Sequence, residues 1–525
     1  MNLLPGLLCL PAICLLLLAM LPYGFANRRV NLLSWVVNGL AVSNALAAFT
    51  ALIWSTVRGP GYIVIASFGQ NLPVNVSAYF DGVSSLMLTL VASIGCVICR
   101  FSIRYLDGEE NQGNYFRWTG FTLGAISVAV VAGNLVLLVA GLLLTSLGLH
   151  QLLVHYADRP AARRAASLKF WFSRLGDVSL VAAAVLLYHE FGTLELPAIF
   201  DRAGSLSESD IANSTAIFAA GWLLVLCAIF KSAQFPFHTW LPETMEAPTP
   251  VSALMHAGIV NAGGYLLIRL APVVSLAPAS MLAAAGLGAF TAFFAALVML
   301  SQTSVKRSLA WSTIAQMGFM IFQCGLGAYS AAMLHIIAHS LYKAHAFLSS
   351  GTVMQERAAM ATTPTTHRSA RIGITCFLTA VGVVALLYVG LAAIAGMSFG
   401  SKPGGYLLGF ILCLGLSRWL SQNLATGWST ALPGTVQSAC LVTAYLTSFK
   451  AVDLLVSVNS SMPAVTLPNG YLLVAAAIAF ALLPALEFSI KRGFRTAWMQ
   501  SLYVLSSNGF YLDTFWRRAA KSFSS

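Results

Sequence analysis

The chain has 525 residues, of which 58% are apolar and only 9% are charged. Soluble domains carry about 25% charged residues, so this composition excludes both a soluble globular protein and a disordered one. The net charge of +12 does not indicate nucleic-acid binding, because proteins of that class gather basic residues on a solvated face. In so apolar a chain, positive charge instead indicates membrane topology.

Apolar runs long enough to cross a bilayer follow one another along the chain. A crossing helix needs about 20 apolar residues, so the sequence predicts an all-α polytopic membrane protein with about 15 (roughly 13–15) transmembrane helices. The first run has no charge before it and Arg28 and Arg29 after it, and we interpret it as a retained span rather than a secretory signal. The predicted spans are 3–22, 31–57, 79–99, 118–132, 135–156, 167–188, 214–236, 250–270, 279–300, 308–327, 330–355, 372–397, 405–422, 435–456 and 470–490.

The nine cysteines are scattered through the chain, nearly all inside apolar runs. Cys96 and Cys99 form one C-x-x-C pair without a second pair, which disfavours a zinc or redox site. We therefore expect the cysteines to be small core residues.

Lysine and arginine gather in cytoplasmic loops. With the N-terminus outside and the C-terminus in the cytoplasm, 21 of the 29 basic residues fall in inward segments and four in outward loops. The longest outward loop, 189–213, is acidic, which agrees with this orientation. The four outward residues are Arg58, Arg202, Arg269 and Lys402. The inward residues are Arg28, Arg29, Arg100, Arg104, Arg117, Arg159, Arg163, Arg164, Lys169, Lys306, Arg307, Arg357, Arg368, Arg371, Arg418, Lys491, Arg492, Arg495, Arg517, Arg518 and Lys521.

Four basic residues remain, and all four are predicted at membrane depth: Arg174, Lys231, Lys343 and Lys450. A charge at the bilayer centre costs roughly 2.5–3.5 kcal/mol on insertion scales. Such residues need a partner or a hydrated cavity, so they are functional candidates.

The densest polar stretch covers residues 230–243 and holds Lys231, Gln234, His238, Thr239 and Glu243. Pro236 removes the helical hydrogen bond to the carbonyl of Ser232, so a break is predicted close to Lys231. A broken membrane helix is tolerated where it lines a cavity or the protein interior. Lysine suits proton transfer there because its protonation responds to burial and to nearby carboxylates. A lysine that only extends to the inner interface is the alternative.

Histidines follow in two further helices. Thr249 and Pro250 predict a helix start, with Thr249 as the N-cap, and His256 lies about 9 Å farther along at ~1.5 Å per residue. His335, His339 and Lys343 are spaced i, i+4, i+8 and share one helical face. A proton relay is the favoured interpretation of these residues. The alternatives are a hydrogen-bonded core role for His256 and metal binding by His335 and His339, which the nearby lysine disfavours.

Acidic residues offer partners for the buried bases. Arg174 and Asp177 are spaced i, i+3 and could neutralise each other, while Asp177 could also approach Lys231. Asp81, Glu243, Glu246 and Glu487 are weaker candidates, expected mostly as capping or interface charges. The chain has no nucleotide-, dinucleotide- or zinc-protease motif and no haem or iron–sulfur cysteine set. We therefore expect no catalytic centre and no cofactor in this chain.

These motifs resemble the antiporter-like subunits of respiratory complex I and of Mrp-type sodium/proton antiporters. The resemblance spans about residues 75–360. It implies two inverted five-helix repeats, each with a broken helix, and a proton relay from Lys231 through His256 toward His335, His339 and Lys343. Asp177 would be the counter-charge, with Arg174, Pro236, His238, Glu243 and Lys306 in supporting positions. The matching stretches are Lys231–Gln234, Trp240–Pro242, Ala247–His256, Arg174–Asp177 and Phe191–Leu194, with His335, His339 and Lys343.

Two departures separate the chain from that pattern. The family's Gly-Trp-Glu is Gly141-Leu142-Leu143 here, so its intramembrane glutamate is absent. The predicted helix 372–397 has neither lysine nor proline, whereas the family usually breaks this helix at a charged residue. A complete antiporter pathway is therefore not expected.

Other stretches resemble the membrane subunits of bacterial Dab inorganic carbon accumulation complexes. They are Leu144–Leu153, Arg159–Ala162, Ser173–Asp177 and His339–Leu348. This resemblance implies a bacterial inner membrane and a large soluble partner at the cytoplasmic face, DabA, similar to a zinc-dependent β-carbonic anhydrase. Protons, or sodium ions as the alternative, would flow down their gradient through this chain and drive vectorial hydration of carbon dioxide to bicarbonate by the partner, which would hold the zinc. The alternatives are a proton-pumping subunit of a respiratory or Mrp complex and a purely structural membrane anchor.

The expected organisation has five parts. They are N-terminal spans (1–110), a first antiporter-like repeat with the broken helix (111–270), a second, degenerate repeat (271–425), C-terminal spans (426–495) and a tail (496–525). The tail combines aromatic and basic residues, which predicts an amphipathic segment at the cytoplasmic membrane surface. Docking of the partner is its alternative role.

Overall fold

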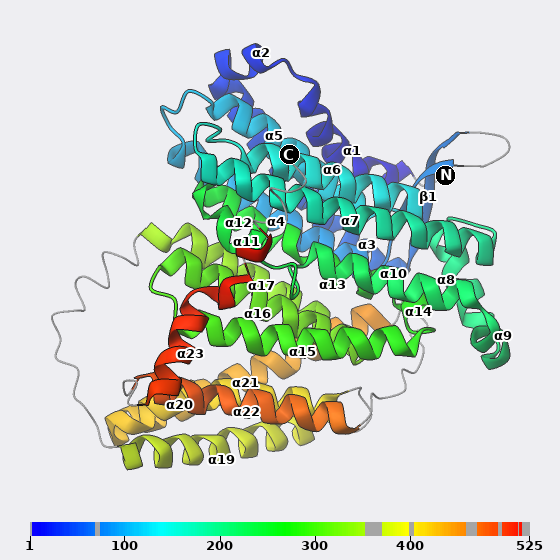
Figure 1. Cartoon of the computed structure of the whole chain (residues 1–525). Coiled ribbons are helices and arrows are strands. Elements are labelled where there is room, and N and C mark those ends of the chain that lie inside the picture. Colours follow the sequence, from blue (N-terminus) through cyan, green and yellow to red (C-terminus); the bar gives the residue numbers. More distant parts are fainter. Residues whose placement is uncertain are drawn as a thin grey trace.

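The structure, a computed structural model, describes residues 3–68, 74–351, 370–397, 404–457, 470–491, 496–512 and 514–516. Within these residues the chain forms a bundle of long helices lying side by side (Figure 1). Several predicted loop and tail charges lie outside the described residues, namely Arg357, Arg368, Lys402, Arg492, Arg495, Arg517, Arg518 and Lys521.

Every predicted span contains a helix or a pair of short helices. Ten helical stretches of the described part are long and apolar enough to cross a membrane, and one of them, Thr249–Arg269, consists of α12 and α13 together. Helices α1 and α10 are shorter apolar helices. The helices of the first half are α1 (Leu3–Leu17), α2 (Tyr23–Arg28), α3 (Val30–Arg58), α4 (Gly82–Tyr105), α5 (Gln112–Val130), α6 (Leu135–Leu153), α7 (Pro160–Phe191), α8 (Leu196–Ser205), α9 (Glu208–Asn213), α10 (Thr215–Lys231), α11 (Trp240–Glu243), α12 (Thr249–Ala257) and α13 (Ala262–Arg269). Those of the second half are α14 (Ala271–Val274), α15 (Pro278–Leu300), α16 (Val305–Gly325), α17 (Tyr329–Leu348), α19 (Ala370–Ile394), α20 (Gly405–Thr426), α21 (Trp428–Ser457), α22 (Gly470–Lys491) and α23 (Ala497–Ser507).

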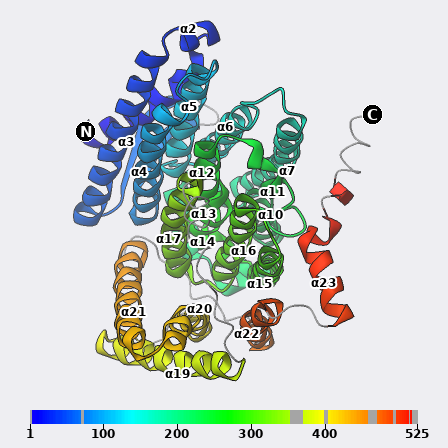
Figure 2. The same ribbon diagram turned by 90° about the vertical axis from the view of Figure 1, so that its left-hand side faces the viewer.

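The helices pack in three groups (Figure 2). Helices α1 to α5 lie together on one side, α6 to α17 form the centre, and α19 to α22 lie beyond them. One hydrophobic core joins the first two groups, whereas the contacts among α19, α20 and α21 form a separate core around Val384, Leu420 and Val442. Large apolar side chains such as Trp35, Ile53 and Val178 are exposed, as expected of helices that face lipid.

A β-hairpin departs from the all-α expectation. Strands β1 (Gly61–Phe68) and β2 (Val74–Phe80) pair antiparallel, from Gly61 opposite Phe80 to Phe68 opposite Val74. Glu195, at the start of α8, accepts hydrogen bonds from Asn75 Nδ2 at 2.9 Å, Ser77 Oγ at 3.0 Å and Tyr62 Oη. The hairpin is thereby joined to the short helices α8 and α9, which also lie outside the predicted spans.

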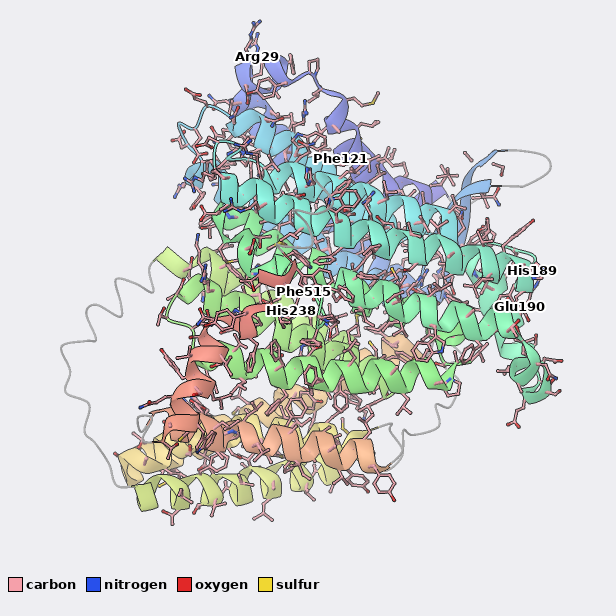
Figure 3. The ribbon with its side chains drawn as sticks, viewed as in Figure 1. Arg29, Phe121, His189, Glu190, His238 and Phe515 are labelled. Atoms are coloured by element: carbon pink, nitrogen blue, oxygen red, sulfur yellow. The ribbon has the colours of Figure 1, made fainter. Side chains whose placement is uncertain are left out.

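Figure 3 shows His189 and Glu190 at the end of the bundle where α8 lies. Arg29 lies on the upper edge of the same view, far from that pair. The hairpin, α8 and α9 therefore cover the end of the bundle that the charge distribution predicts to face outward.

Two basic residues lie elsewhere than the sequence predicts. Lys169, counted as an inward charge near the start of its predicted span, is instead buried within α7, nine residues after the start of this helix at Pro160. Arg269, counted as an outward loop charge, is buried at the end of α13 and forms an ion pair with Asp81 at 2.7 Å. Lys450, predicted at membrane depth, lies within α21 and is exposed on its surface. Removing Lys169 and Arg269 leaves 20 inward against 3 outward residues, so the bias that predicts the orientation remains.

The cysteines are only partly a core feature. Cys99, Cys227 and Cys324 are buried, as expected, but Cys14 and Cys440 are exposed. The expectation of core cysteines is wrong for these two, because each lies on an outward face of an apolar helix, where a small apolar side chain is also tolerated.

Candidate functional site

Helix α10 ends at Lys231, which confirms the predicted break. The amide of Gln234 donates to the carbonyl of Ile229 at 3.2 Å, and Ala233 between them has a φ of 49°. This bonding pattern, with a left-handed residue after the cap, is a standard way to terminate a helix. Alanine is strained in that conformation, so the surrounding packing holds the turn. The chain then continues without regular structure until α11.

A second interruption was not predicted. The span 250–270 is one helix in the sequence-based prediction, but in the structure α12 ends at Ala257 and α13 begins at Ala262, with a short 3-10 helix between them at Ile259–Asn261. Thr249 is the first residue of α12 and makes no side-chain cap. Its hydroxyl instead lies 3.0 Å from Tyr105 Oη, so the predicted N-cap role of Thr249 is wrong.

The two interruptions meet at Ser232. Its hydroxyl donates to the carbonyl of Val260 at 2.7 Å and accepts from the amide of Gly263 at 3.0 Å. Both backbone groups are freed by the interruption between α12 and α13, and Ser232 is itself fully buried. We call the region formed by residues 231–234 and 258–263 the helix junction.

Lys231 is paired at this junction. Its Nζ lies 2.5 Å from Asp177 Oδ1, and Arg174 Nη2 lies 2.7 Å from Asp177 Oδ2. Both side chains of the Lys231–Asp177 pair are almost fully buried. The sequence left open whether Asp177 neutralises Arg174 or approaches Lys231, and the structure shows that it does both.

The approach of α7 to α10 depends on Gly176. A Cβ atom added there would lie 3.3 Å from Lys231 Cγ and 3.3 Å from Phe230 Cβ, closer than ordinary contacts. Glycine at this position therefore lets the α7 backbone come against the lysine side chain, one residue before the carboxylate that binds it.

Lys169 is a member of this site that the sequence-based interpretation missed. Its Nζ donates to the carbonyl of Ser146 at 2.9 Å and to Ser146 Oγ at 2.8 Å. Ser146 Oγ in turn donates to Ser173 Oγ at 2.8 Å. Lys169 and Lys231 both line a cavity of about 30 Å³. The other lining residues are Leu142, Thr145, Ser146, Ser173, Phe230, Trp240, Ile259 and Ala262.

A second polar cluster lies on α12 and α17. His256 is fully buried, and its ring stacks on Phe347 with centroids 4.4 Å apart. His256 and His339 lie within electrostatic range of Lys343. The Lys343 side chain is fully buried and donates to the carbonyl of Leu309 at 2.9 Å. Within the described residues, neither ring nitrogen of His256 has a hydrogen-bond partner.

His335 extends this cluster toward the third group of helices. Its ring stacks on His339, with centroids 5.9 Å apart. It also lines a cavity of about 390 Å³ between α16 and α17 on one side and α20 and α21 on the other. Gln323, Tyr445 and Ser448 are the other polar residues of this cavity. His335 therefore lies between Lys343 and a space large enough for several water molecules.

The C-terminal segment, by which we mean residues 507–512 and 514–516, packs on the loop that follows Lys231. Trp516 Nε1 donates to the carbonyl of Pro236 at 2.9 Å, and its ring packs on Phe172 and Phe237. Gln302 Nε2 donates to the carbonyl of Ser507 at 3.2 Å.

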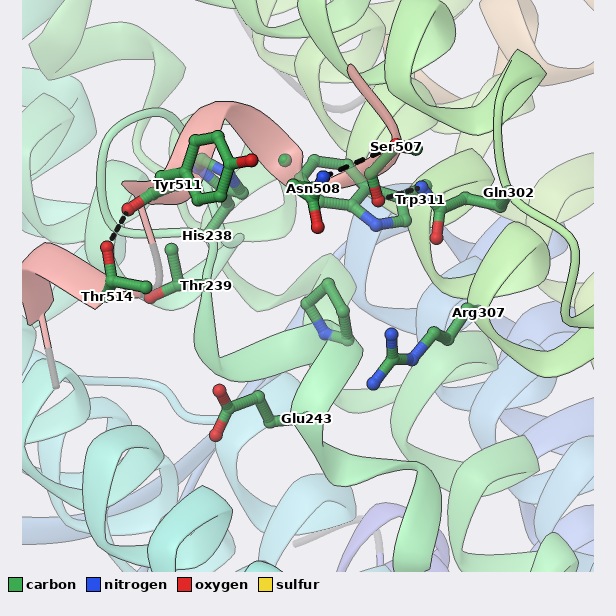
Figure 4. Close-up of a pocket in the computed structure, with 12 residues that line it drawn as sticks. His238, Thr239, Glu243, Gln302, Arg307, Trp311, Ser507, Asn508, Tyr511 and Thr514 are labelled. Atoms are coloured by element: carbon green, nitrogen blue, oxygen red, sulfur yellow. Dashed lines mark hydrogen bonds between the residues drawn. The ribbon is translucent and has the colours of Figure 1, made fainter. Parts of the chain in front are cut away.

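Between this segment and α16 lies a third cavity, of about 230 Å³ (Figure 4). His238, Glu243 and Arg307 line it from the protein core, and Asn508, Tyr511 and Thr514 line it from the C-terminal segment. His238 is fully buried, and its ring nitrogens have no hydrogen-bond partner within the described residues.

The predicted site residues thus form two groups. Lys231, Asp177 and Arg174 are in direct contact, and His256, His335, His339 and Lys343 form the second group. The structure shows no direct contact between Lys231 and His256, but Ile259, three residues after His256, lines the Lys231 cavity. Lys306 lies at the start of α16, outside both groups. Among the described residues, no three His, Cys, Asp or Glu side chains gather as a metal site.

Comparison with known proteins defines the class as an antiporter-like membrane subunit. Residues 132–398 match the family described as NADH:quinone oxidoreductase/Mrp antiporter, TM, and residues 67–116 match the N-terminus of chain 5 of NADH-ubiquinone oxidoreductase (complex I). Among solved structures, the Mrp complex from Dietzia sp. DQ12-45-1b has a similar fold, with a TM-score of 0.58 and 25% identity over 98% of this chain and 57% of that chain.

Two relatives match the chain nearly end to end. The probable inorganic carbon transporter subunit DabB2 of Halothiobacillus neapolitanus is 35% identical over 98% of this chain and 93% of the relative. The probable inorganic carbon transporter subunit DabB of Hydrogenovibrio crunogenus is 34% identical over 86% of this chain and 85% of the relative. The chain therefore belongs to the DabB family of antiporter-like membrane subunits, as its motifs predict.

Proposed function

We propose that this chain conducts protons, or another cation, down their gradient and thereby drives a partner similar to DabA to convert carbon dioxide to bicarbonate. The observation that carries this proposal is Lys231, a buried lysine at the end of an interrupted helix. It is held by one carboxylate and lines a cavity. A membrane lysine in this setting can exchange its proton without leaving the carboxylate unpaired, since Arg174 holds the other oxygen of Asp177.

The second polar group supports a path beyond Lys231. Neutral histidine both accepts and donates a proton, so His256, His339 and His335 are suited to pass one between Lys343 and the cavity beside His335. Water at the helix junction would connect Lys231 to His256. The cavity beside His238 would release protons toward the face that the charge distribution predicts to be cytoplasmic.

Placement in the membrane follows from the charge bias. We propose that the chain lies in the bacterial inner membrane with its N-terminus outside and its C-terminus in the cytoplasm. The C-terminal segment and the His238 cavity would then face the soluble zinc partner. The names of the relatives as inorganic carbon transporter subunits support a membrane location within a complex of several subunits.

The test compares Lys231→Met with Lys450→Met in cells that depend on carbon uptake. Lys450 is a matched control because it is also a lysine within a helix, but it is exposed on α21. Uptake by Lys231→Met should fall to the level of cells lacking the chain, with the complex still assembled on co-purification, while Lys450→Met should behave as the parent. Full uptake by an assembled Lys231→Met complex would contradict the role of Lys231.

Ionophores distinguish a chain that couples ion flow to carbon uptake from one that only anchors its partner at the membrane. A protonophore should abolish uptake if protons drive it, and a sodium ionophore should abolish it if sodium does. Uptake that persists with both would indicate that the chain only anchors its partner. Mass spectrometry of the complex in mild detergent should find a large zinc protein.

A respiratory or Mrp subunit is disfavoured by two features. Helix α19 is one uninterrupted helix of 25 residues, and leucines occupy positions 142 and 143, where that family carries tryptophan and glutamate. Redox subunits in the purified complex would support the respiratory alternative.

A further inference from the structure

Lys169 has no carboxylate to compensate its charge. The two oxygens of Asp177 are taken by Lys231 and Arg174, and Lys169 forms no ion pair within the described part of the chain. An uncompensated ammonium in a membrane span costs several kcal/mol. The site as a whole holds three basic side chains and one acid.

The hydrogen bonds of Lys169 match a neutral amine. A neutral lysine has two N–H donors and one lone pair, whereas an ammonium has three donors. Lys169 donates twice, to the carbonyl and to the hydroxyl of Ser146. These two bonds use both donors of a neutral amine, and in that state the lone pair would be available to accept a proton.

The cavity provides the route between the two lysines. Its volume of about 30 Å³ compares with about 10–15 Å³ for one water molecule on the same scale. One or two water molecules therefore fit in the cavity that Lys169 and Lys231 both line. Ser146, Ser173 and Thr145 line the same cavity and add the polar partners that a buried water needs.

We propose that Lys169 is the proton-exchange partner of Lys231. This inference rests on the proposed function and names a second proton carrier for it. One N–H bond of the Lys231 ammonium breaks, its proton passes to a water molecule in the cavity, and that water gives a different proton to the lone pair of Lys169. The positive charge thereby moves from Lys231 to Lys169, and the total charge of the pair is unchanged. Lys231 becomes a neutral amine, and Asp177 remains paired with Arg174.

The position of Lys169 gives this exchange a direction along the membrane. Lys169 precedes Asp177 by eight residues on α7, which is about 12 Å at 1.5 Å per residue. It lies on the side of Asp177 nearer to Pro160, the end of α7 predicted to be cytoplasmic. His150, one helical turn after Ser146 on α6, contacts Phe170 edge-to-face with ring centroids 5.5 Å apart and is a further titratable side chain toward that end.

The test uses Lys169→Arg in the purified complex, reconstituted in vesicles with a pH-sensitive dye. Arginine keeps the positive charge and the donors but does not release its proton. A structural lysine would therefore be replaced by arginine without loss, whereas a proton carrier would not. We expect proton flux to fall at least about tenfold, with Lys450→Arg as the matched control at parent flux.

Two more variants, Lys169→Gln and Lys231→Met, complete the test. Lys169→Gln is neutral and can still donate to Ser146, and its proton flux should also fall. If Lys169→Arg does not assemble, the flux of Lys169→Gln tests the role of Lys169 instead. Parent-level flux in an assembled Lys169→Arg complex, with flux abolished in Lys231→Met, would overturn the role of Lys169 and leave the proposed function intact. Parent-level flux in Lys231→Met would instead overturn the proposed function.

Discussion

Ser232 is the residue that joins the two interrupted helices. Its hydroxyl satisfies the carbonyl of Val260 and the amide of Gly263, which have no helical partners at the interruption. Gly263 makes this approach possible, since a Cβ atom there would lie 2.4 Å from the carbonyl oxygen of Ala228. Unsatisfied backbone groups are costly in a membrane, so the hydroxyl stabilises the junction beside Lys231.

Ser232→Ala should therefore destabilise the protein. It leaves a buried carbonyl and amide without this partner, which costs about 1–3 kcal/mol. Thermal unfolding of the detergent-solubilised protein measures the loss. Ser43→Ala is the matched control, because the Ser43 hydroxyl is exposed and bonds only to the carbonyl of Gly39 in its own helix. Equal unfolding temperatures for both variants would show that Ser232 does not hold the junction.

Among single residues, the sequence predicted Lys231, Asp177 and the histidines as members of the candidate site but did not predict Lys169. The residues before the predicted span include Arg159, Arg163 and Arg164, which suggest a loop. In the structure α7 begins at Pro160 and carries the two exposed arginines within its first turns. Hydropathy marks where apolar sequence begins rather than where a helix begins, so a lysine near that boundary was assigned to solvent.

At the scale of elements, a buried ion pair joins α4 to α13. Asp81 is the N-cap of α4, with Oδ1 accepting from the amide of Ser84 at 2.8 Å and Oδ2 accepting from Arg269 Nη1 at 2.7 Å. The guanidinium also lies over the ring of Tyr79, 4.8 Å from its centroid. The same carboxylate therefore starts one helix and holds the end of the other.

Arg269→Met should destabilise the protein by about 3–5 kcal/mol, because it leaves the Asp81 carboxylate buried without its cation. The double variant Arg269→Met with Asp81→Asn should recover part of this loss, since asparagine is neutral and still caps a helix. Unfolding temperatures of the single and double variants in detergent measure the difference. A double variant less stable than Arg269→Met would contradict the importance of the unpaired charge.

The elements themselves were predictable to different degrees. Long apolar runs predicted every span, and Pro236 predicted the break after Lys231. The interruption at Ile259–Asn261 was missed because no proline lies between Val251 and Ala271; it depends on the contact with Ser232, which is distant in sequence. The hairpin is not predictable from the apolar runs, because its strands lie almost entirely in the segment between the predicted spans 31–57 and 79–99.

At the scale of the whole molecule, the C-terminal segment returns to the centre of the bundle. Trp516 contacts the carbonyl of Pro236 and packs on Phe172 and Phe237. Figure 1 shows this red segment, together with α23, lying against the α11 and α16 region. The sequence predicted a tail at the membrane surface with partner docking as an alternative, and the structure adds a contact five residues after Lys231.

Trp516→Ala should release this segment from the loop. Loss of the ring contacts and of the hydrogen bond should make the tail more susceptible to limited proteolysis of the solubilised complex, by several-fold in cleavage rate. Trp498→Ala is the matched control, because Trp498 is 61% exposed on α23. Parent-like cleavage of Trp516→Ala would show that the tail is held by other contacts.

The single helix junction has an energetic consequence for carbon accumulation. Helix α19 is uninterrupted, so within the described residues the helix junction is where the proposed function places ion transfer, and the smallest coupling that it allows is one elementary charge per turnover. One charge crossing 100 mV releases about 2.3 kcal/mol, and every 1.4 kcal/mol corresponds to a tenfold ratio of concentrations. At one charge per turnover, a membrane potential of 100 mV would therefore hold the ratio of bicarbonate to carbon dioxide about 50-fold above its equilibrium value. Steeper accumulation would require a larger potential, a pH gradient or more ions per turnover.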